Sequence, residues 1–440
     1  MKNSSKPINA QTAIASHDRC CGCGICAAIC PVNCIKMKFD KNLEYKPFVD
    51  SNACIACGLC IQVCPDNQRT NIKVEKAFRE NYPNNTKNNF LGDFFNCYVG
   101  CVTRLEDRSA SASGGILTAI LEELLARNVV NAVVLVGASS YERTGKFFKA
   151  TIVENVENVR RNRGSKYYPV EFSDVIKKVE SENRSYAIVA LPCVTLAIRK
   201  AELYHKKLKE NIRYIFSPVC GHGVSAAYTE YLLKTNGIEP SSVVKISYRD
   251  KTGISNANDF NFLVEYRGEK GIRVKRLGFI SSEVGKVWCN YLFTPNKCLY
   301  CTDFAGELSD ASFADAWLPE YTHDVNGNSI VIVRNGEIGS LVKDMIRKGK
   351  LRLSSIPAEK VIEAQWSALQ FKKESIKGRI RLKKFHQDFP DYMVNWREPS
   401  IIKAAHKNWR ILLNMHLSRW LYRNRLLRSA VHLICLKIAA

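Results

Sequence analysis

The 440-residue sequence lacks the features of a membrane-spanning or secreted chain. It contains no run of about 18 apolar residues, which a bilayer-spanning helix needs. Its first 19 residues contain no apolar core of roughly 7–15 residues, which a secretory signal requires. Cysteine, by contrast, is abundant, with 18 residues. Without a secretory signal, this number predicts metal binding in a reducing cytoplasm rather than a disulfide framework.

Acidic residues are few compared with basic ones. The 42 Asp and Glu against 65 Lys and Arg leave a net charge of +23. The sequence is 46% hydrophobic and 24% charged, which is typical of a globular protein and argues against disorder. Nucleic-acid binding is one interpretation of the charge, but no recognition motif or zinc-finger spacing supports it. We therefore expect no nucleic-acid partner.

Composition divides the chain into four parts, which predict a mixed α+β and α/β protein. Residues 1–66 hold ten cysteines, and residues 67–93, rich in Asn, Lys and Pro, predict a linker. Residues 94–352 alternate apolar strands with amphipathic helices, which is typical of an α/β domain. Residues 353–440 predict a basic, helical tail.

Within the α/β part, three apolar runs predict buried strands and three amphipathic runs predict helices. The predicted strands are 132–138, 186–192 and 213–219, and the predicted helices are 115–127, 195–207 and 224–237. A different pattern, typical of an antiparallel β insertion, covers 243–250, 260–268 and 272–280.

The cysteine-rich part contains the one internal repeat. CCGCGICAAICP (20–31) recurs as CIACGLCIQVCP (54–65), and both contain the run C-x2-C-x2-C-x3-C-P. In two-cluster ferredoxins such runs hold two 4Fe-4S cubes, and the fourth cysteine of each run binds the other cube. Zinc is the alternative, which two complete runs disfavour. We assign one cube to Cys20, Cys23, Cys26 and Cys64, and the other to Cys30, Cys54, Cys57 and Cys60.

Two further cysteines of this part do not fit the run. Cys21 has the wrong spacing to Cys23, and Cys34 occupies an apolar position after Pro31. A small buried residue suits that position. We predict that neither cysteine is a ligand.

Four later cysteines lie beside turns. Cys193 and Cys220 each end an apolar run, and Cys298 and Cys301 form a C-x2-C pair. Because sites in open α/β sheets collect beyond the carboxyl ends of strands, these thiols could meet and hold a third cube. The alternative is a set of buried structural cysteines.

Two glycine-containing segments are candidates for a phosphate-bearing ligand. SASGG, with Ser113, Gly114 and Gly115, precedes a predicted helix, whose exposed N–H groups suit an anion. GSKYY, with Gly164, Ser165, Lys166 and Tyr167, adds a cation and aromatic rings. A capped helix and a solvated loop are the respective alternatives.

These motifs occur in one order: SASGGILTA, GSKYYP, ALPCVTLAIRK, VCGHGVS, YRDKTG and KCLYCTDFAGELSDASFADAW. The series resembles the family of coenzyme F420 hydrogenase/dehydrogenase beta subunits, over residues 95–350, with a two-cluster ferredoxin unit fused in front. The resemblance implies an FAD-binding α/β domain and a third 4Fe-4S cluster on Cys193, Cys220, Cys298 and Cys301. It also implies that the SASGG and GSKYY residues contact the flavin.

The resemblance further implies an oxidoreductase that moves electrons between 4Fe-4S clusters, FAD and a hydride-exchanging organic substrate or deazaflavin coenzyme. A ferredoxin-like protein is the expected redox partner. The alternative is an electron-transfer subunit serving a separate catalytic partner, for example in a cell-surface polysaccharide pathway, since some family members lack coenzyme F420. His222 departs from the smaller residue of other members. It is a candidate proton donor near the flavin, or a residue that fills a helix N-terminus.

The last 40 residues contain eight Lys or Arg and no Asp or Glu. An apolar stripe, with Arg and Asn opposite, recurs at helical spacing and includes Trp409, Leu412, Leu413, Leu417, Trp420 and Leu421. Such a helix suits the surface of an anionic membrane. The alternative is a helix packed on the body, with its arginines solvated. We therefore expect a cytoplasmic protein, with peripheral membrane contact as one interpretation of the tail.

Overall fold

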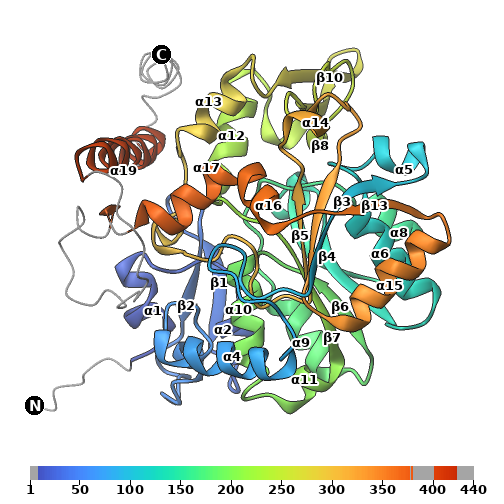
Figure 1. The fold of residues 1–440 in the computed structure, drawn as a ribbon. Helices are drawn as coiled ribbons and strands as arrows, with labels where there is room; N and C mark the ends of the chain where they lie inside the picture. The colour runs from blue at the N-terminus through green and yellow to red at the C-terminus, as the bar shows by residue number, and fades with distance from the viewer. Residues whose placement is uncertain (1–7, 377, 380–400, 424–440) are drawn as a thin grey trace, which may run out of the picture.

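The computed structural model describes residues 8–376, 378–379 and 401–423 (Figure 1). Its largest element is an eight-stranded sheet of order β13-β3-β12-β11-β7-β6-β4-β5. Three neighbouring pairs, β4–β6, β6–β7 and β7–β11, are parallel, and the outer pairs are antiparallel. The expected mixed α/β architecture is confirmed. The strands are β3 (Asn96–Val102), β4 (Ala132–Ala138), β5 (Phe148–Val153), β6 (Tyr186–Val189), β7 (Ile212–Pro218), β11 (Ala311–Asp315), β12 (Ser329–Val333) and β13 (Leu351–Ser355).

The middle strands are covered on both faces, which explains their nearly continuous apolar sequences. In β4, Val133 and Leu135 share a core with α6 (Ile116–Ala126) and α15 (Gly336–Arg347). The alternate residues Ala132 and Val134 enter the opposite core, because successive side chains of a strand point to opposite faces. Figure 1 shows the two groups of helices on either side of the sheet. The opposite core is covered by α9 (Ser173–Ser181), α10 (Pro192–Ala201) and α11 (Lys206–Asn211).

The cysteine-rich part is packed directly on this second group of helices. It consists of the antiparallel hairpin β1–β2 (Ile35–Phe39 and Tyr45–Val49) and short helices α1 (Ala10–Ala13), α2 (Ile25–Ala28) and α3 (Leu59–Gln62). Ile25, Ile29 and Val63 belong to the same core as the sheet residues Val134 and Ile188. The N-terminal part and the sheet therefore share one hydrophobic core.

Residues 67–93, which the sequence predicts to be a linker, are partly helical in the structure. They contain helix α4 (Gln68–Asn81), which packs against α10. Lys200 of α10 is fully buried and donates hydrogen bonds to Asn71 Oδ1 (2.8 Å) and to the carbonyl of Asn67 (2.9 Å). The Asn-rich composition that suggested a flexible segment instead supplies amide and carbonyl acceptors to a buried cation.

The antiparallel insertion forms as predicted. Strands β8 (Val243–Asp250), β9 (Asn261–Gly268) and β10 (Gly271–Gly278) make a three-stranded sheet of order β10-β9-β8. Its inner face, with Tyr248 and Phe262, packs on α12 (Ala226–Thr235) and α13 (Glu283–Cys289). This sheet therefore adds a wall beyond the carboxyl ends of β6 and β7.

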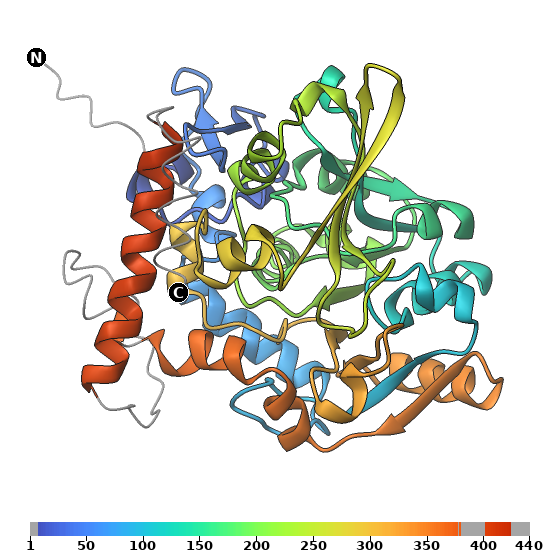
Figure 2. The same cartoon turned by 90° about the horizontal axis from the view of Figure 1, so that it is seen from above.

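The C-terminal part is helical, as predicted, but it is not an appendage. It contains α16 (Ala358–Ala364), α17 (Trp366–Leu369), the π-helical turn η4 (Gln370–Glu374) and α19 (Ile401–Arg423). Figure 2 shows α19 beside the N-terminal part. Arg419 is 7% exposed and pairs with Asp18 (3.0 Å) and Glu44 (2.5 Å).

The expectation that α19 turns its Arg and Asn away from its apolar stripe toward solvent is wrong for the described part of this helix. Asn408, Asn414 and Arg419 are buried, whereas Trp409 is 58% exposed and Trp420 is 56% exposed. The ion pairs hold Arg419, whereas Asn408 and Asn414 donate hydrogen bonds to the carbonyls of Ser375 (3.2 Å) and Asn290 (3.2 Å). Over its described residues, α19 therefore packs on the body, as in the alternative for the tail, although Arg419 is buried and not solvated. Residues 424–440, with Arg425, Arg428, Cys435 and Lys437, lie outside the described residues.

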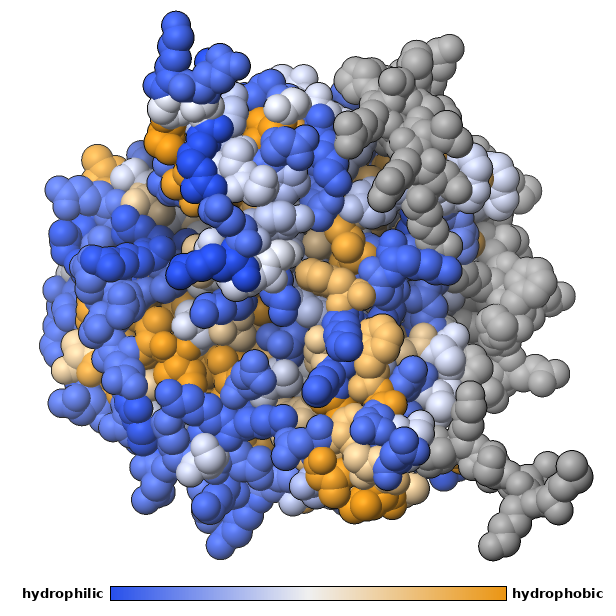
Figure 3. Space-filling view, turned by 180° about the vertical axis from the view of Figure 1, so that it is seen from behind, coloured by the Kyte–Doolittle hydropathy of each residue, from blue (hydrophilic) through white to orange (hydrophobic). Residues whose placement is uncertain are grey.

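The surface shows no continuous apolar belt on the side displayed in Figure 3, where apolar patches are separated by hydrophilic side chains. Within the described ranges, no helix has both the length and the hydropathy to cross a bilayer.

Candidate functional site

The cysteines assigned to the first two cubes lie around two matching turns. Helices α2 and α3 begin after Gly24 (φ 81°) and Gly58 (φ 75°), so each turn reverses the chain through a left-handed residue. The thiol of Cys26 interacts electrostatically with those of Cys20 and Cys64. A cavity on the other side is lined by all four of Cys30, Cys54, Cys57 and Cys60. Cys64 thus lies near Cys26 of the first run, which also interacts with Cys60 and Cys21, and Cys30 lines a cavity with three cysteines of the second run, so the exchanged assignment stays a prediction.

The donor set in these turns suits iron–sulfur clusters. Burial and the nearby Cys21 raise the pKa of the Cys64 thiol to about 12, and a coordinated metal would reverse this by binding the thiolate. Among the described residues, no three His, Cys, Asp or Glu side chains are placed to hold a single metal ion. In a 4Fe-4S cube the four thiolates sit at separate corners, so they need not meet at one point.

The two matching turns differ in their surroundings, which gives a direct prediction. A Cβ on Gly24 would lie 2.5 Å from Glu171 Oε2 and 2.9 Å from the backbone nitrogen of Ser173, whereas no atom lies within 4 Å of one on Gly58. Both substitutions to Ala should cost about 1–2 kcal/mol for the left-handed backbone. Gly24→Ala should lose about 1–3 kcal/mol more because of overpacking against α9.

Chemical denaturation of both variants under anaerobic conditions measures this difference. Equal free energies of unfolding for Gly24→Ala and Gly58→Ala would contradict the close packing of the first turn on α9.

The later four cysteines also come together, at the carboxyl ends of β6 and β7. Cys193 lies in the first turn of α10 and Cys220 follows β7. Cys298 lies within a short 3-10 turn (Asn296–Tyr300) that ends at Cys301. Cys193 interacts electrostatically with Cys301 and Cys220, and Cys220 with Cys298 and Cys301. The backbone N–H of Gly223 donates to Cys298 Sγ (3.3 Å). The predicted convergence of two strand ends with one C-x2-C pair is therefore present.

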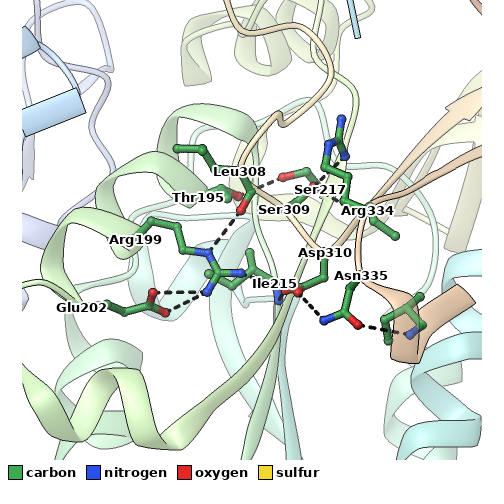
Figure 4. Close-up of polar contacts among 12 residues, drawn as sticks. Thr195, Arg199, Glu202, Ile215, Ser217, Leu308, Ser309, Asp310, Arg334 and Asn335 are labelled. Carbon is green, nitrogen blue, oxygen red and sulfur yellow. Dashed lines mark hydrogen bonds and ion pairs between the residues drawn. The ribbon is translucent and has the colours of Figure 1, made fainter. Parts of the chain in front are cut away.

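A buried polar network holds the elements that carry these thiols (Figure 4). Asp310 accepts hydrogen bonds from Arg199 of α10 (2.8 Å), from the backbone N–H of Ile215 in β7 (2.7 Å) and from Asn335 (2.8 Å). Arg334 donates to Ser312 Oγ (2.7 Å). The network connects α10, β7 and the loop after Cys301, which are elements that also carry Cys193, Cys220 and Cys301.

Cys21 lies between the first thiol set (Cys20, Cys23, Cys26 and Cys64) and the third (Cys193, Cys220, Cys298 and Cys301). The proximity of the Cys193 and Cys23 side chains lowers the pKa of the Cys21 thiol below the usual value. The structure does not test the prediction that Cys21 is not a ligand. Cys21 does lie beside Cys23 of the first set and Cys193 of the third set.

The SASGG segment is held in a close-packed turn before α6. Gly115 caps the helix with φ 81°, and a Cβ on Gly114 would lie 2.5 Å from the carbonyl oxygen of Gly100. Ser113 Oγ donates to the carbonyl of Asn328 (2.8 Å), and the Gly114 N–H donates to Ser329 Oγ (2.9 Å). No side chain caps the first turn of α6. Its N–H groups therefore form a potential anion site.

The GSKYY segment adjoins this turn. An ion pair between Arg163 and Asp107 (3.6 Å) joins the stretches that precede the two segments, and α8 (Val156–Arg161) packs on α6. Gly164 is exposed with φ 93°, and Ser165 is half-buried. Tyr167 accepts a hydrogen bond from Arg249 Nη1 (3.3 Å). The structure thus brings together both segments that the sequence singled out.

Two half-buried lysines lie at this junction. Lys166 Nζ donates to the carbonyls of Arg163 (3.0 Å) and Gly164 (2.8 Å), and Lys251 Nζ donates to those of Ser113 (3.1 Å) and Asn326 (2.6 Å). Removal from water lowers the pKa of each ammonium group to about 7, with Arg249 adding to the shift at Lys251. A bound anion would favour the protonated form of both lysines.

His222 lies between this junction and the third thiol set. Its ring is 4.3 Å from that of Trp288, which in turn is 4.4 Å from Tyr167. It is 8% exposed, and its Nε2 has no hydrogen-bond partner among the described residues. Burial, with a contribution from Lys372, lowers its pKa to about 3. His222 is therefore neutral near pH 7 and can donate or accept a hydrogen bond, but it is not a charged acid.

The structure places at this site three residues to which the sequence analysis assigns no role here. Lys372 contacts the third thiol set, Arg249 joins Tyr167 to Asp315, and Cys21 joins two thiol sets. Lys372 has no distinguishing pattern in the sequence, whereas Arg249 lies in the YRDKTG motif, which could have marked it. The adjacent thiols Cys20 and Cys21 were the one hint for the third.

Comparisons with known families agree with this arrangement. The model for the N-terminal part of the coenzyme F420 hydrogenase/dehydrogenase beta subunit matches residues 97–177, and the model for its C-terminal part matches 183–359. A 4Fe-4S dicluster domain matches residues 19–68. The dicluster match implies two 4Fe-4S clusters in the first 70 residues, as the repeat predicted.

Two curated relatives have sequences similar to this chain. A subunit of the F(420)H(2) dehydrogenase of Methanosarcina mazei is 22% identical over 336 residues, which cover 76% of this chain and 84% of that protein. Coenzyme F420-dependent sulfite reductase of Methanocaldococcus jannaschii is 24% identical over 263 residues, which cover 59% of this chain and 38% of that protein.

A solved structure shares the fold. A chain of the F420-reducing NiFe hydrogenase complex of Methanosarcina barkeri aligns with a TM-score of 0.51 and 17% identity, over 69% of this chain and 97% of that one.

Proposed function

Because the chain belongs to the family of coenzyme F420 hydrogenase/dehydrogenase beta subunits and carries a 4Fe-4S dicluster domain in front of the family match, we propose that it is an iron–sulfur flavoprotein oxidoreductase. In this proposal it binds FAD and a third 4Fe-4S cluster, and it exchanges electrons with a ferredoxin-like protein and a hydride with a small molecule, for example a deazaflavin coenzyme. The observation that carries the proposal is the short aromatic contact path from the GSKYY segment to the third thiol set.

The third cluster is proposed for Cys193, Cys220, Cys298 and Cys301. Four thiols from three separate segments meet beside the sheet, and burial raises the pKa of Cys220 to about 12. Here the cation of Lys372 faces three of them, which suits thiolates rather than thiols.

FAD is proposed to lie across the junction of SASGG and GSKYY. The uncapped first turn of α6, Lys166 and Lys251 together provide the N–H groups and cations that a diphosphate requires. Tyr167 and Trp288 provide aromatic faces beyond it. When bound, FAD supplies the ability to accept two electrons as a hydride and to pass them on singly.

His222 is proposed to contact the bound flavin through Nε2. Its neighbours Trp288 and Tyr291 hold the ring in place at 4.3 and 4.7 Å. Because His222 is neutral near pH 7, its role would be to orient a group by a hydrogen bond, not to provide a formal positive charge.

The three thiol sets also suggest where electrons enter. Cys57 is exposed, whereas Cys23 and Cys26 belong to the core around the sheet. The second set (Cys30, Cys54, Cys57 and Cys60) therefore reaches the surface, and the first set lies behind it. Cys21 lies between the first set and Cys193. We propose that electrons from an external carrier pass to the second set, then to the first set and then to the third set.

The flavin proposal predicts about one FAD released per chain when the protein is denatured. Lys166→Met should weaken FAD binding by about tenfold to a hundredfold, because a charge-assisted hydrogen bond contributes about 1.5–3 kcal/mol. Lys207→Met, which changes an exposed lysine of α11, is the matched control. Calorimetric titration of the cluster-loaded, flavin-depleted protein with FAD provides both dissociation constants. Cluster-loaded protein that neither contains nor binds FAD would rule out the oxidoreductase proposal.

The second candidate is an electron-transfer component of a larger enzyme. The relative in Methanosarcina mazei is named as a subunit, and the structural neighbour is part of a hydrogenase complex. Turnover of a hydride donor by the purified chain alone favours an enzyme, whereas electron exchange without such turnover favours a component of a complex.

A further inference from the structure

The segment that follows the family match covers the third thiol set. The C-terminal family model ends at residue 359, and α16, α17 and η4 continue to Glu374. A Cβ on Gly221 would lie 3.3 Å from the Cβ of Ala368, and Gln365 Nε2 donates to the carbonyl of Asp315 (2.6 Å). This segment therefore packs directly over the loop that contains Cys220.

The π-helical turn η4 directs three consecutive side chains inward. Phe371 is stacked on Tyr291 at 4.4 Å, and Lys373 pairs with Glu307 at 2.5 Å. Lys372 lies between them and is 1% exposed. Wide π-helical turns occur often at functional sites, where they change the direction of side chains.

Lys372 points into the third thiol set. Its ammonium group is buried beside the thiols of Cys301, Cys220 and Cys298, and their proximity raises its pKa. Lys373 uses the nearby carboxylate of Glu307, and the side chains that raise the pKa of Lys372 are the thiols of Cys301, Cys220 and Cys298, which bound iron would hold as thiolates. A buried ammonium group needs such partners, because its desolvation is costly.

We propose that Lys372 is the cation that sets the reduction potential of the third 4Fe-4S cluster. The proposal rests on the proposed function, because it assumes that Cys193, Cys220, Cys298 and Cys301 hold that cluster. Reduction adds one negative charge to a cluster. A fixed cation and a hydrogen bond to a ligand sulfur stabilise this charge, so they raise the reduction potential. Lys372 would thereby make the third cluster a better electron acceptor than it would be without the C-terminal segment.

The test is a redox titration of the full-length, anaerobically purified protein, followed by electron paramagnetic resonance. The signal of the third cluster is identified by its absence from a Cys298→Ser variant. Lys372→Gln should lower the equilibrium constant for reduction of this cluster by at least about tenfold, which is about 59 mV for one electron. Lys372→Arg, which keeps the charge, and Lys373→Gln, which changes the neighbouring lysine, should each shift it by less than about threefold, or about 28 mV.

The outcomes separate the inference from the proposed function. Wild-type protein with about eight iron per chain would mean that the third cluster is absent, and the proposed function would fail first. About twelve iron in all variants, with the same midpoint in Lys372→Gln and wild type, would overturn only the role of Lys372. Loss of four iron from Lys372→Gln but not from Lys372→Arg would support a required cation. Loss of four iron from both Lys372 variants would overturn the proposal, because it would show that the cluster requires the packing of the lysine side chain and not its charge.

Discussion

Anaerobically purified protein should contain about twelve iron and twelve sulfide per chain, four of each for every 4Fe-4S cube. The expectation follows from three sets of four thiols, of which the dicluster match accounts for two. Cys298→Ser should reduce the content to about eight, because a cube loses stability when one of its four thiolates is removed. Iron and sulfide analysis, together with Mössbauer spectroscopy, measures the change.

Cys289→Ser is the matched control for this experiment. Cys289 lies nine residues before Cys298, on α13, and is exposed. Its substitution should leave the iron content unchanged. A wild-type value near eight that Cys298→Ser does not alter would remove the third cluster from the account.

Exchange with an external one-electron carrier should depend on the second thiol set. Cys57→Ser removes the exposed cysteine of this set. The variant should lose most of its rate of reduction by a reduced ferredoxin but retain reduction by dithionite, since a small reductant can reach the other clusters. Stopped-flow absorbance with both reductants separates the two effects.

Cys34→Ser is the control, because Cys34 is buried 3.5 Å from Cys30 Sγ and is predicted not to be a ligand. Point substitutions are preferable here to deletion of residues 1–66. Ile25, Ile29 and Val63 share the core of the sheet, so deletion would expose that core. If Cys57→Ser accepts electrons from ferredoxin as fast as wild type, the second set is not where electrons enter.

Much of the fold could be predicted from local patterns. Val133 and Leu135 alternate with Ala132 and Val134 within one apolar run, and such a run predicts a strand buried on both faces. The paired cysteine runs predicted the dicluster part because their spacing is itself the ligand geometry. Cys193 and Cys220 could be placed together because each follows a strand and the two strands are parallel neighbours.

The remaining features depend on contacts distant in sequence. Residues 67–93 look like a linker by composition, and only the burial of Lys200, 129 residues after Asn71, shows why they are ordered. Arg419 looks like a surface cation until Asp18 and Glu44, 401 and 375 residues away, are placed beside it. Lys372 likewise looks like a surface cation in the sequence, and only the fold buries it beside the third thiol set. Neither hydrophobic periodicity nor motif spacing carries information about such pairs.

The central claim is that electrons pass between the iron–sulfur clusters and a flavin bound in the α/β domain. The most direct measurement is a single anaerobic mixing experiment, in which the full-length protein is mixed with reduced ferredoxin while cluster and flavin absorbance are followed together. The account predicts that the clusters are reduced first and that flavin absorbance then falls in the same sample. Clusters that become reduced while one bound FAD per chain stays oxidised would contradict it.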